Sequence, residues 1–184
     1  MNSGESSYRR YLDGDKSGFD DIIDLYHDSL IYFLKRYVNS EQDAEDLAAD
    51  TFLEMLIHPS RYSFGSSLKT YIFSVARHKA IDFVRRRHRE LVPAEWDEAT
   101  FADDNNAEKA AIASDEQREI AAAMSKIDKN YREALMLIFY EGLSGDDAAK
   151  VMNKNKKQMA NLIYRAKAAL KKELTKGGYS YEEQ

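Results

Sequence analysis

Residues 67–89 constrain the fold more than any other stretch of the chain; they read SLKTYIFSVARHKAIDFVRRRHR. Apolar residues recur here at helical spacing, which predicts a helix with one buried face: Leu68, Ile72, Val75, Ala76, Ala80 and Phe83. The other side is polar: Lys69, Ser74, Arg77, His78 and Arg85. The stretch then ends in Arg85, Arg86, Arg87 and Arg89. Such a cationic end suits a nucleic-acid backbone, although arginines in a last turn also complement the helix dipole.

The remaining chain predicts an all-α protein, because long amphipathic patterns dominate and no convincing alternating strand pattern occurs. Its 184 residues allow one domain or two small ones. The absence of cysteine excludes thiolate metal sites and thiol nucleophiles and fits a reducing cytoplasm. The N-terminus lacks the apolar core of a signal peptide, and no run is long enough to span a membrane. We therefore expect a cytoplasmic protein without membrane insertion.

The net charge of −5 hides a strong segregation of charge along the chain. Residues 41–54 contain six acids and no base, and residues 95–108 are acidic again. Residues 61–89 and 150–176 are both strongly basic. This alternation predicts two nucleic-acid surfaces and at least one surface for a different partner.

The N-terminal half predicts a flexible lead-in over residues 1–16 and a helical domain over residues 17–90. Its first two helices are expected at about 17–37 and 41–57, the second opened by a capping-box spacing at Ser40 and Asp43. The second helix carries an acidic ridge at spacings of three and four: Asp43, Asp46, Asp50 and Glu54. A solvated face and a basic partner are both compatible with this ridge. A loop follows, in which Gly65 is free to take unusual backbone angles.

The C-terminal half predicts a linker over residues 91–113, with Trp96 as a local anchor, then a second domain over 114–176 and a tail over 177–184. In that domain one helix ends near Asp128 and another, marked by Tyr131, Leu135, Ile138 and Phe139, is stopped by Gly142. A short helix at 146–152, a tight turn and a longer helix at 156–176 form the pattern of a helix-turn-helix.

The last helix begins among three lysines, Lys154, Lys156 and Lys157. Positive charge there opposes the helix dipole, and bound phosphate would reverse the sign of that interaction. Gln158, Asn161 and Arg165 follow on the exposed side and are side chains that can hydrogen-bond base edges. The alternative is a lysine-rich helix that only keeps the surface soluble.

The sequence contains no recognisable catalytic centre. HExxH, P-loop and GxSxG motifs are absent, and the carboxylates lie on predicted exposed faces. His78 and Asp82 are four residues apart, but two candidate ligands without a third are a weak metal signal. We therefore expect neither an enzyme nor a metal or other cofactor.

Three motifs in order resemble the bacterial sigma factors of the extracytoplasmic-function group. They are DAEDLAADTFLEML at 43–56, LKTYIFSVARHKAIDFVRRRHR at 68–89, and the ending NLIYRAKAALKKEL at 161–174, with an acidic linker between the second and third. The resemblance covers about residues 17–175. It implies two helical domains, equivalent to the second and fourth regions of larger sigma factors, and a protein that confers promoter recognition and promoter melting on core RNA polymerase.

The resemblance also implies roles for individual residues. Asp46, Leu47 and Asp50, with Glu54 on the same ridge, would form the interface to core polymerase. Tyr62, Phe64, Gly65 and Ser66 lie in the loop that would hold a flipped base of the non-template strand. The helix that opens the minus-ten element would use Lys69, Tyr71, Ser74, Arg77 and His78, with backbone contacts from Arg85, Arg86, Arg87 and Arg89. The minus-thirty-five element would be read by Lys156, Lys157, Gln158, Asn161 and Arg165, beside Lys154.

Implied partners are core RNA polymerase, double- and single-stranded promoter DNA, and an anti-sigma factor. The chain departs from the family pattern at Ala49, Tyr71, Asp128-Lys129-Asn130 and the KKQMAN start of the last helix. These departures bear on the promoter sequence and core affinity, not on the fold. Two alternatives remain: a helical DNA-binding regulator that does not join the polymerase, and a protein-interaction module or decoy.

Overall fold

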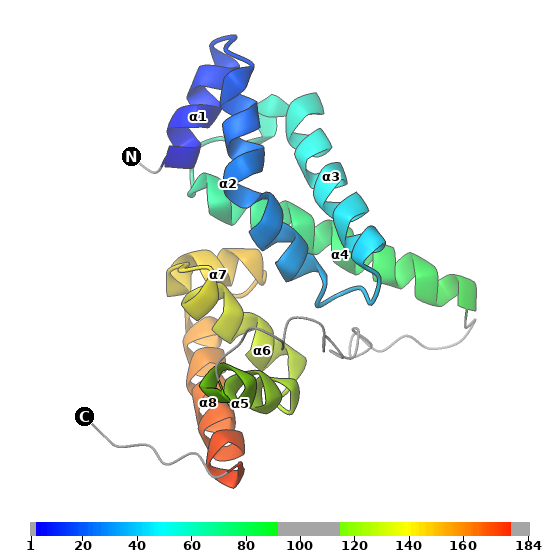
Figure 1. Cartoon of the computed structure of the whole chain (residues 1–184). Helices are drawn as coiled ribbons and strands as arrows, with labels where there is room; N and C mark the ends of the chain where they lie inside the picture. The colour runs from blue at the N-terminus through cyan, green and yellow to red at the C-terminus, as the bar shows by residue number, and fades with distance from the viewer. Residues whose placement is uncertain (1–2, 92–114, 178–184) are drawn as a thin grey trace. The chain divides into compact units, whose positions relative to one another are not determined.

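The computed structural model describes residues 3–91 and 115–177, and every regular element in these ranges is helical (Figure 1). The described residues form two compact units, one containing α1–α4 and the other containing α5, α6, α8 and most of α7. This agrees with the predicted all-α, two-domain organisation. The predicted linker with Trp96 and the tail beyond Gly177 lie outside the described residues.

The first helix of the N-terminal unit, α1 (Ser3–Leu12), was not expected. It packs on α2 (Ser17–Leu34), and the side chain of Tyr8 is fully buried. The helices approach so closely that a Cβ on Gly18 would lie 2.3 Å from the carbonyl oxygen of Ser7. The prediction of a flexible lead-in is therefore wrong for Ser3–Leu12. The polar composition of this segment concealed two anchoring tyrosines: Tyr8 is buried in the core, and the Tyr11 ring lies 5.1 Å from the Phe19 ring of α2.

The next two helices follow their predicted pattern. α2 ends at Leu34, three residues earlier than expected, because the chain tightens into a turn that still buries Tyr37. α3 (Glu41–Ile57) begins as predicted, with the Ser40 hydroxyl accepting from the backbone N–H of Asp43. Buried residues of α2 and α3 supply much of the core: Phe19, Ile22, Leu30, Phe33, Ala44, Leu47, Phe52 and Met55.

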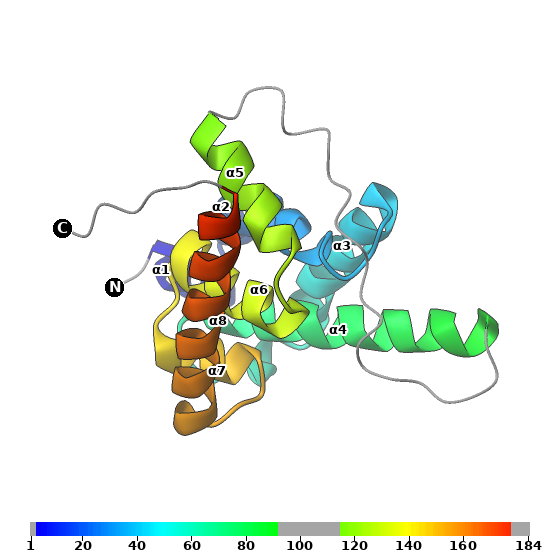
Figure 2. The same ribbon diagram turned by 90° about the horizontal axis from the view of Figure 1, so that it is seen from below.

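The long helix α4 (Leu68–Leu91) spans the predicted basic stretch and packs against α2 and α3. Leu68, Ile72, Ala76 and Ala80 are fully buried, which confirms these four members of the predicted apolar face. Val75 and Phe83 are only half-buried, and Phe73, which was not predicted, is fully buried. The last turns of α4 extend beyond the rest of the N-terminal unit, as Figures 1 and 2 both show. A short 3-10 turn, η1 (Pro59–Arg61), and a loop connect α3 to α4. In that loop Phe64, not Gly65, takes the left-handed backbone conformation, with φ of 58°.

The C-terminal unit is formed by α5 (Asp115–Ser125), α6 (Lys129–Leu135), α7 (Gly145–Val151) and α8 (Lys156–Lys176). Ile127, Leu135 and Ala166 form a buried cluster, with Met124 and Tyr131 packed against it. A π-helical turn, η3 (Met136–Tyr140), continues α6. Because a π turn inserts an extra residue, it shifts the helical phase, so Met136 and Leu137 are buried while Phe139 is 64% exposed. The expectation that Phe139 continues the apolar face is therefore wrong.

The predicted helix-turn-helix is present as α7 and α8. The Ser144 hydroxyl accepts from the backbone N–H of Asp147 and so caps the start of α7, as the capping-box spacing of these two residues predicts. The connecting turn places Asn153 at φ of 51°, a conformation that asparagine tolerates better than most residues. α8 begins with a complete capping box, in which Asn155 and Gln158 each accept from the other's backbone N–H.

Candidate nucleic-acid interface

An aromatic cluster underlies the loop between η1 and α4. Tyr62 is buried at its centre, with its ring centroid 4.6 Å from that of Phe64 and 5.1 Å from that of Tyr71. Its hydroxyl donates to the Ser66 carbonyl at 2.7 Å, which ties the two sides of the loop together. Tyr8 packs edge-on against Tyr62 at 5.5 Å. The loop that contains the four predicted residues is thus supported by an aromatic cluster that is already assembled without DNA.

The hydroxyl groups inside this cluster are neutral over the physiological range. Burial raises the pKa of Tyr8 to about 12 and that of Tyr62 to about 12. Burial also raises the pKa of Tyr71, which is only partly buried. A neutral, partly exposed ring such as Tyr71 can stack on a nucleobase without placing a negative charge beside the DNA.

The predicted minus-ten residues divide between two sides of α4. Tyr71, Ser74, His78 and Arg85 recur at spacings of three, four and seven, so they share one outward face. The Ser74 hydroxyl donates to the Thr70 carbonyl of its own helix. Lys69 lies away from that face, with its ammonium 5.5 Å from the Phe73 ring centroid. Arg77 is half-buried.

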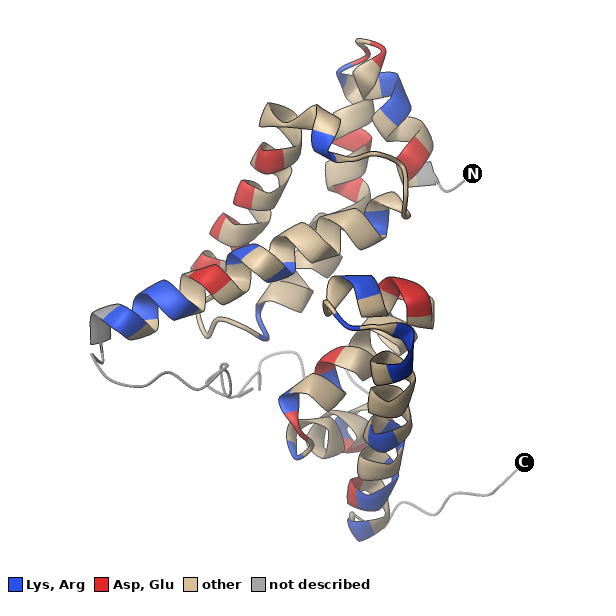
Figure 3. Ribbon diagram, turned by 180° about the vertical axis from the view of Figure 1, so that it is seen from behind, with Lys and Arg blue, Asp and Glu red and all other residues tan. Residues whose placement is uncertain are grey.

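The arginines at the end of α4 are not equivalent. Arg87 forms an ion pair with Asp43 of α3 at 2.6 Å, and Arg89 donates to the Arg85 carbonyl at 3.4 Å. Arg85 lies 4.0 Å from Asp82. Arg86 is exposed, and among the described residues it has no ion-pair partner. Figure 3 shows the resulting concentration of basic residues on the last turns of α4.

The acidic ridge of α3 also divides into two pairs; Figure 3 shows the acidic residues of this helix in red. Its ends are used within the unit, since Asp43 pairs with Arg87, and Glu54 pairs with Arg61 and lies 3.7 Å from Lys79. Asp46 and Asp50 are exposed and form no ion pair with any residue in the described ranges. The middle of the ridge is therefore available to a basic partner, whereas its ends stabilise the packing of α3 on η1 and α4.

Leu47 does not belong to this exposed surface, because its side chain is buried in the core. Sequence reasoning missed exposed apolar side chains on the same helix, among them Leu53 and Ile57. They follow Asp46 and Asp50 at spacings of three and four, so all four lie on one face. That spacing was the signal in the sequence. The surface of α3 thus joins two carboxylates to an apolar end.

The start of α8 presents most of the predicted minus-thirty-five residues to solvent. Lys156, Lys157, Asn161 and Arg165 are exposed, and Lys154 is half-buried. Lys156 forms an ion pair with Asp146 of α7 at 2.6 Å, so it also links the two helices of the motif. The side-chain oxygen of Gln158 is occupied by the backbone N–H of Asn155. Gln158 therefore has a capping role that the sequence analysis did not assign.

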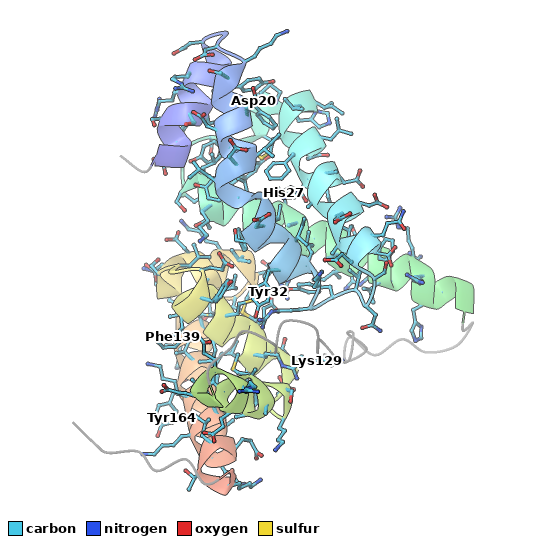
Figure 4. The ribbon with its side chains drawn as sticks, viewed as in Figure 1. Asp20, His27, Tyr32, Lys129, Phe139 and Tyr164 are labelled. Carbon is cyan, nitrogen blue, oxygen red and sulfur yellow. The ribbon has the colours of Figure 1, made fainter. Side chains whose placement is uncertain are left out.

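A second exposed group on the C-terminal unit was not predicted. Phe139 of η3 and Tyr164 of α8, both labelled in Figure 4, are largely exposed, at 64% and 77%. The ammonium of Lys167 lies 5.1 Å from the Phe139 ring centroid. The π turn that exposes Phe139 has no signature that periodicity reveals.

The described ranges contain no group of three or more His, Cys, Asp or Glu side chains arranged to hold a metal ion. His78 is exposed, and Asp82 lies near Arg85. Within the same ranges, no helix has both the length and the apolar character needed to cross a membrane.

Comparison with known families identifies both units. Residues 22–90 match Sigma-70 region 2, and residues 117–170 match Sigma-70, region 4. The first match covers most of α2, all of α3 and all but the last residue of α4, and the second covers most of α5–α8.

Full-length relatives give the same assignment. The chain is 31% identical to the ECF RNA polymerase sigma factor SigM of Bacillus subtilis over 159 residues, which cover 83% of this chain and 92% of that protein. It is 29% identical to SigX of the same organism, covering 83% of this chain and 81% of SigX.

Solved structures share the fold. The sigma factor RpoE from Bartonella quintana, in complex with the anti-sigma factor NepR, has a TM-score of 0.65 at 23% identity and covers 85% of this chain and 96% of its own. CnrH, in complex with the cytosolic domain of CnrY, has a TM-score of 0.66 at 20% identity and covers 95% of this chain and 98% of its own. Together with the family matches, these findings show that the chain belongs to the ECF sigma factors, the initiation factors that direct RNA polymerase to promoters.

Proposed function

We propose that this sigma factor docks on core RNA polymerase through the middle of α3 and opens the minus-ten element with the η1–α4 loop and α4. α8 then reads the minus-thirty-five element. The observation that carries the proposal is the division of the acidic ridge. Asp46 and Asp50 are exposed and unpaired among the described residues, while Asp43 and Glu54 are paired within their own unit.

Asp46 and Asp50 carry like charges four residues apart on one helix. Their repulsion lowers the stability of the free protein by about a few tenths of a kcal/mol. A basic surface on core polymerase would relieve that repulsion. The adjacent Leu53 and Ile57, at 49% and 60% exposure, add apolar area that a partner could cover. The combination of acidic and apolar groups on one helix face therefore favours a docking surface over a face that is only solvated.

The N-terminal unit supports capture of single-stranded DNA. Tyr71 and Phe64 are partly exposed and rest on the buried Tyr62, so their rings are already positioned before DNA arrives. Stacking of a base on such a ring contributes about 1–3 kcal/mol, which offsets part of the cost of opening the duplex. Arg85 and Arg86 are placed to add phosphate contacts on the projecting end of α4.

The C-terminal unit supports recognition of double-stranded DNA. Lys157, Asn161 and Arg165 are exposed on the first half of α8. Docking on polymerase would hold this helix and α4 at one spacing, which makes the second DNA contact effectively intramolecular. Weak separate contacts would then give firm promoter binding.

Two further inferences rest on family membership. The protein acts in the cytoplasm, where the polymerase and the promoters are. An anti-sigma factor is its expected regulator, as NepR is for the structurally similar RpoE. No cofactor is needed for the proposed steps, which use hydrogen bonds, stacking and charge.

The test is core binding. Purified protein is mixed with core RNA polymerase from the organism that encodes it, resolved by size exclusion, and compared with Asp46→Lys/Asp50→Lys. The matched control is Asp20→Lys/Asp24→Lys, which reverses two exposed carboxylates four residues apart on α2 (Asp20 is labelled in Figure 4).

Co-elution of the wild type and the α2 control, with loss of the α3 variant, would support the docking surface. Equal co-elution of all three proteins would show that core polymerase binds elsewhere. If the wild type does not co-elute with core polymerase, the alternative of a DNA-binding regulator that does not join the polymerase is favoured instead.

A further inference from the structure

α1 brings a cationic side chain to the edge of the aromatic loop. The guanidinium carbon of Arg9 lies 4.1 Å from the ring centroid of Phe64, which is a close cation–π contact. Phe64 is also the residue with φ of 58°, a strained conformation for a bulky side chain. Such strain persists only where the surroundings hold the residue in place, and it is often found at functional sites.

α1 is itself fixed against this loop. The Tyr8 hydroxyl donates to the Pro59 carbonyl at 3.2 Å, and the Tyr8 ring lies 5.5 Å from Tyr62 and 6.3 Å from Phe64. On its other side α1 packs closely on Gly18 of α2. Arg9 is therefore presented by a helix that is anchored to the loop and to α2 at once.

No carboxylate among the described residues neutralises the charge of Arg9. Its neighbour Arg10 is neutralised by Asp21 at 2.6 Å and Asp15 at 3.4 Å. Arg9 is exposed and forms no ion pair with any residue in the described ranges. Its guanidinium contacts the Phe64 ring, and its charge slightly opposes the rise that burial causes in the pKa of Tyr62. Stacking leaves all five N–H donors of a guanidinium at its edge, where they can bind a phosphate.

We propose that Arg9, stacked on Phe64, contacts a phosphate of the single-stranded promoter DNA held at the loop 62–67. α1 is then part of the DNA-binding surface. This inference rests on the proposed minus-ten function and adds one cationic contact and one helix to it. The ring of Phe64 fixes the guanidinium, so a phosphate is bound by a group that has already lost its side-chain freedom.

The experiment compares Arg9→Ala with Arg10→Ala, which removes the same side chain one position away. Holoenzyme made with each full-length variant is titrated with a forked promoter DNA whose non-template strand is single-stranded across the minus-ten element. The affinity is measured over a range of salt concentrations. Losing one phosphate contact on a single strand lowers the slope of log K against log salt by about 0.7.

For Arg9→Ala we expect a shallower slope of log K against log salt and an affinity reduced several-fold at low salt. Arg10→Ala should keep the wild-type slope. Arg9→Lys should restore the slope, because it keeps the charge. Equal slopes for Arg9→Ala and Arg10→Ala would overturn the inference alone. A wild-type holoenzyme that does not bind the fork would overturn the proposed minus-ten function together with it.

Discussion

The two candidate DNA-binding surfaces are built in different ways. In the N-terminal unit the loop residues depend on a buried cluster assembled from three elements, with Tyr8 from α1, Tyr62 from the loop and Tyr71 from α4. In the C-terminal unit the reading residues come from a single helix, and Lys157, Asn161 and Arg165 are exposed side chains on the first turns of α8.

This difference matches the two forms of DNA that the surfaces are proposed to bind. An unpaired base has to be held on a fixed platform, because stacking requires a ring that does not move away. A duplex already has a fixed groove, so a rigid helix with adaptable side chains is sufficient. Damage to the first surface should therefore also destabilise its unit, whereas damage to the second should leave its unit folded.

The largest expected effect comes from Tyr62→Ala. Truncating a buried aromatic side chain costs about 3–5 kcal/mol, and here it also removes the support of Phe64 and Tyr71. Hydrogen exchange measured by mass spectrometry should show faster exchange throughout α1–α4 and unchanged exchange in α5–α8. Tyr164→Ala, at a site that is 77% exposed, is the control and should alter stability by less than about 0.5 kcal/mol. If exchange in α1–α4 of the Tyr62→Ala protein is as slow as in the wild type, the supporting role of the cluster is refuted.

The same cluster should make the N-terminal unit sensitive to alkali. The folded-state pKa of Tyr8 and of Tyr62 is about 12, above the ordinary value of 10.0, so folding favours the neutral hydroxyls. This stabilisation is complete below pH 10 and is lost as the pH rises toward 12. Urea unfolding followed by circular dichroism between pH 9 and about 11.5 should show the decrease.

Tyr8→Phe/Tyr62→Phe is the control for that titration, since it removes both hydroxyls and keeps both rings. Its free energy of unfolding should fall less steeply over the same pH interval. Parallel curves for the variant and the wild type would assign the alkaline loss to other groups.

The spacing of apolar residues in the sequence correctly predicted several helices and their buried faces. The bounds of α3, the buried face of α4 and the helix-turn-helix all follow from such repeats and from caps at Ser40 and Ser144. Family motifs placed the exposed Asp46, Asp50, Lys157 and Arg165 on surfaces.

Features that depend on tertiary contacts could not be predicted. α1 is anchored by Tyr8 and Tyr11, and two aromatic residues in a polar segment are too few to reveal a helical period. Phe64 takes the left-handed conformation beside a glycine that would adopt it at lower cost, which reflects the packing of its ring. Leu47 was assigned to a surface because the motif includes it, although its place on the helix directs it into the core. The π turn after α6 has no sequence signature.

The C-terminal surface is tested by Lys156→Ala/Lys157→Ala. Promoter binding by the holoenzyme should weaken, and the loss of two phosphate contacts on duplex DNA should lower the salt slope by about 1.8. Binding to core polymerase and exchange in α5–α8 should change little, because both lysines are exposed. Footprinting of the minus-thirty-five region provides the measurement.

A refinement separates the two lysines. Lys156 is paired with Asp146, so Asp146→Ala should release it and strengthen low-salt promoter binding slightly. An unchanged minus-thirty-five footprint in the double lysine variant would contradict the assignment of α8 as the reading helix.

The smallest effect is expected at Gln158. It sharpens the comparison between the aromatic cluster of the N-terminal unit and the proposed recognition helix α8. The side-chain oxygen of Gln158 already accepts from Asn155, so only its NH₂ group remains for DNA. A bidentate contact to adenine needs both groups, and Gln158 cannot make one while it caps the helix. Gln158→Ala should therefore leave base preferences in a randomised minus-thirty-five library nearly unchanged, whereas Asn155→Ala should cost about 1 kcal/mol of helix stability by loss of the cap. If Gln158→Ala instead relaxes the preference for adenine as strongly as loss of a bidentate contact would, the capping box must open on DNA. The start of α8 would then be remodelled by its ligand, unlike the preformed aromatic cluster of the N-terminal unit.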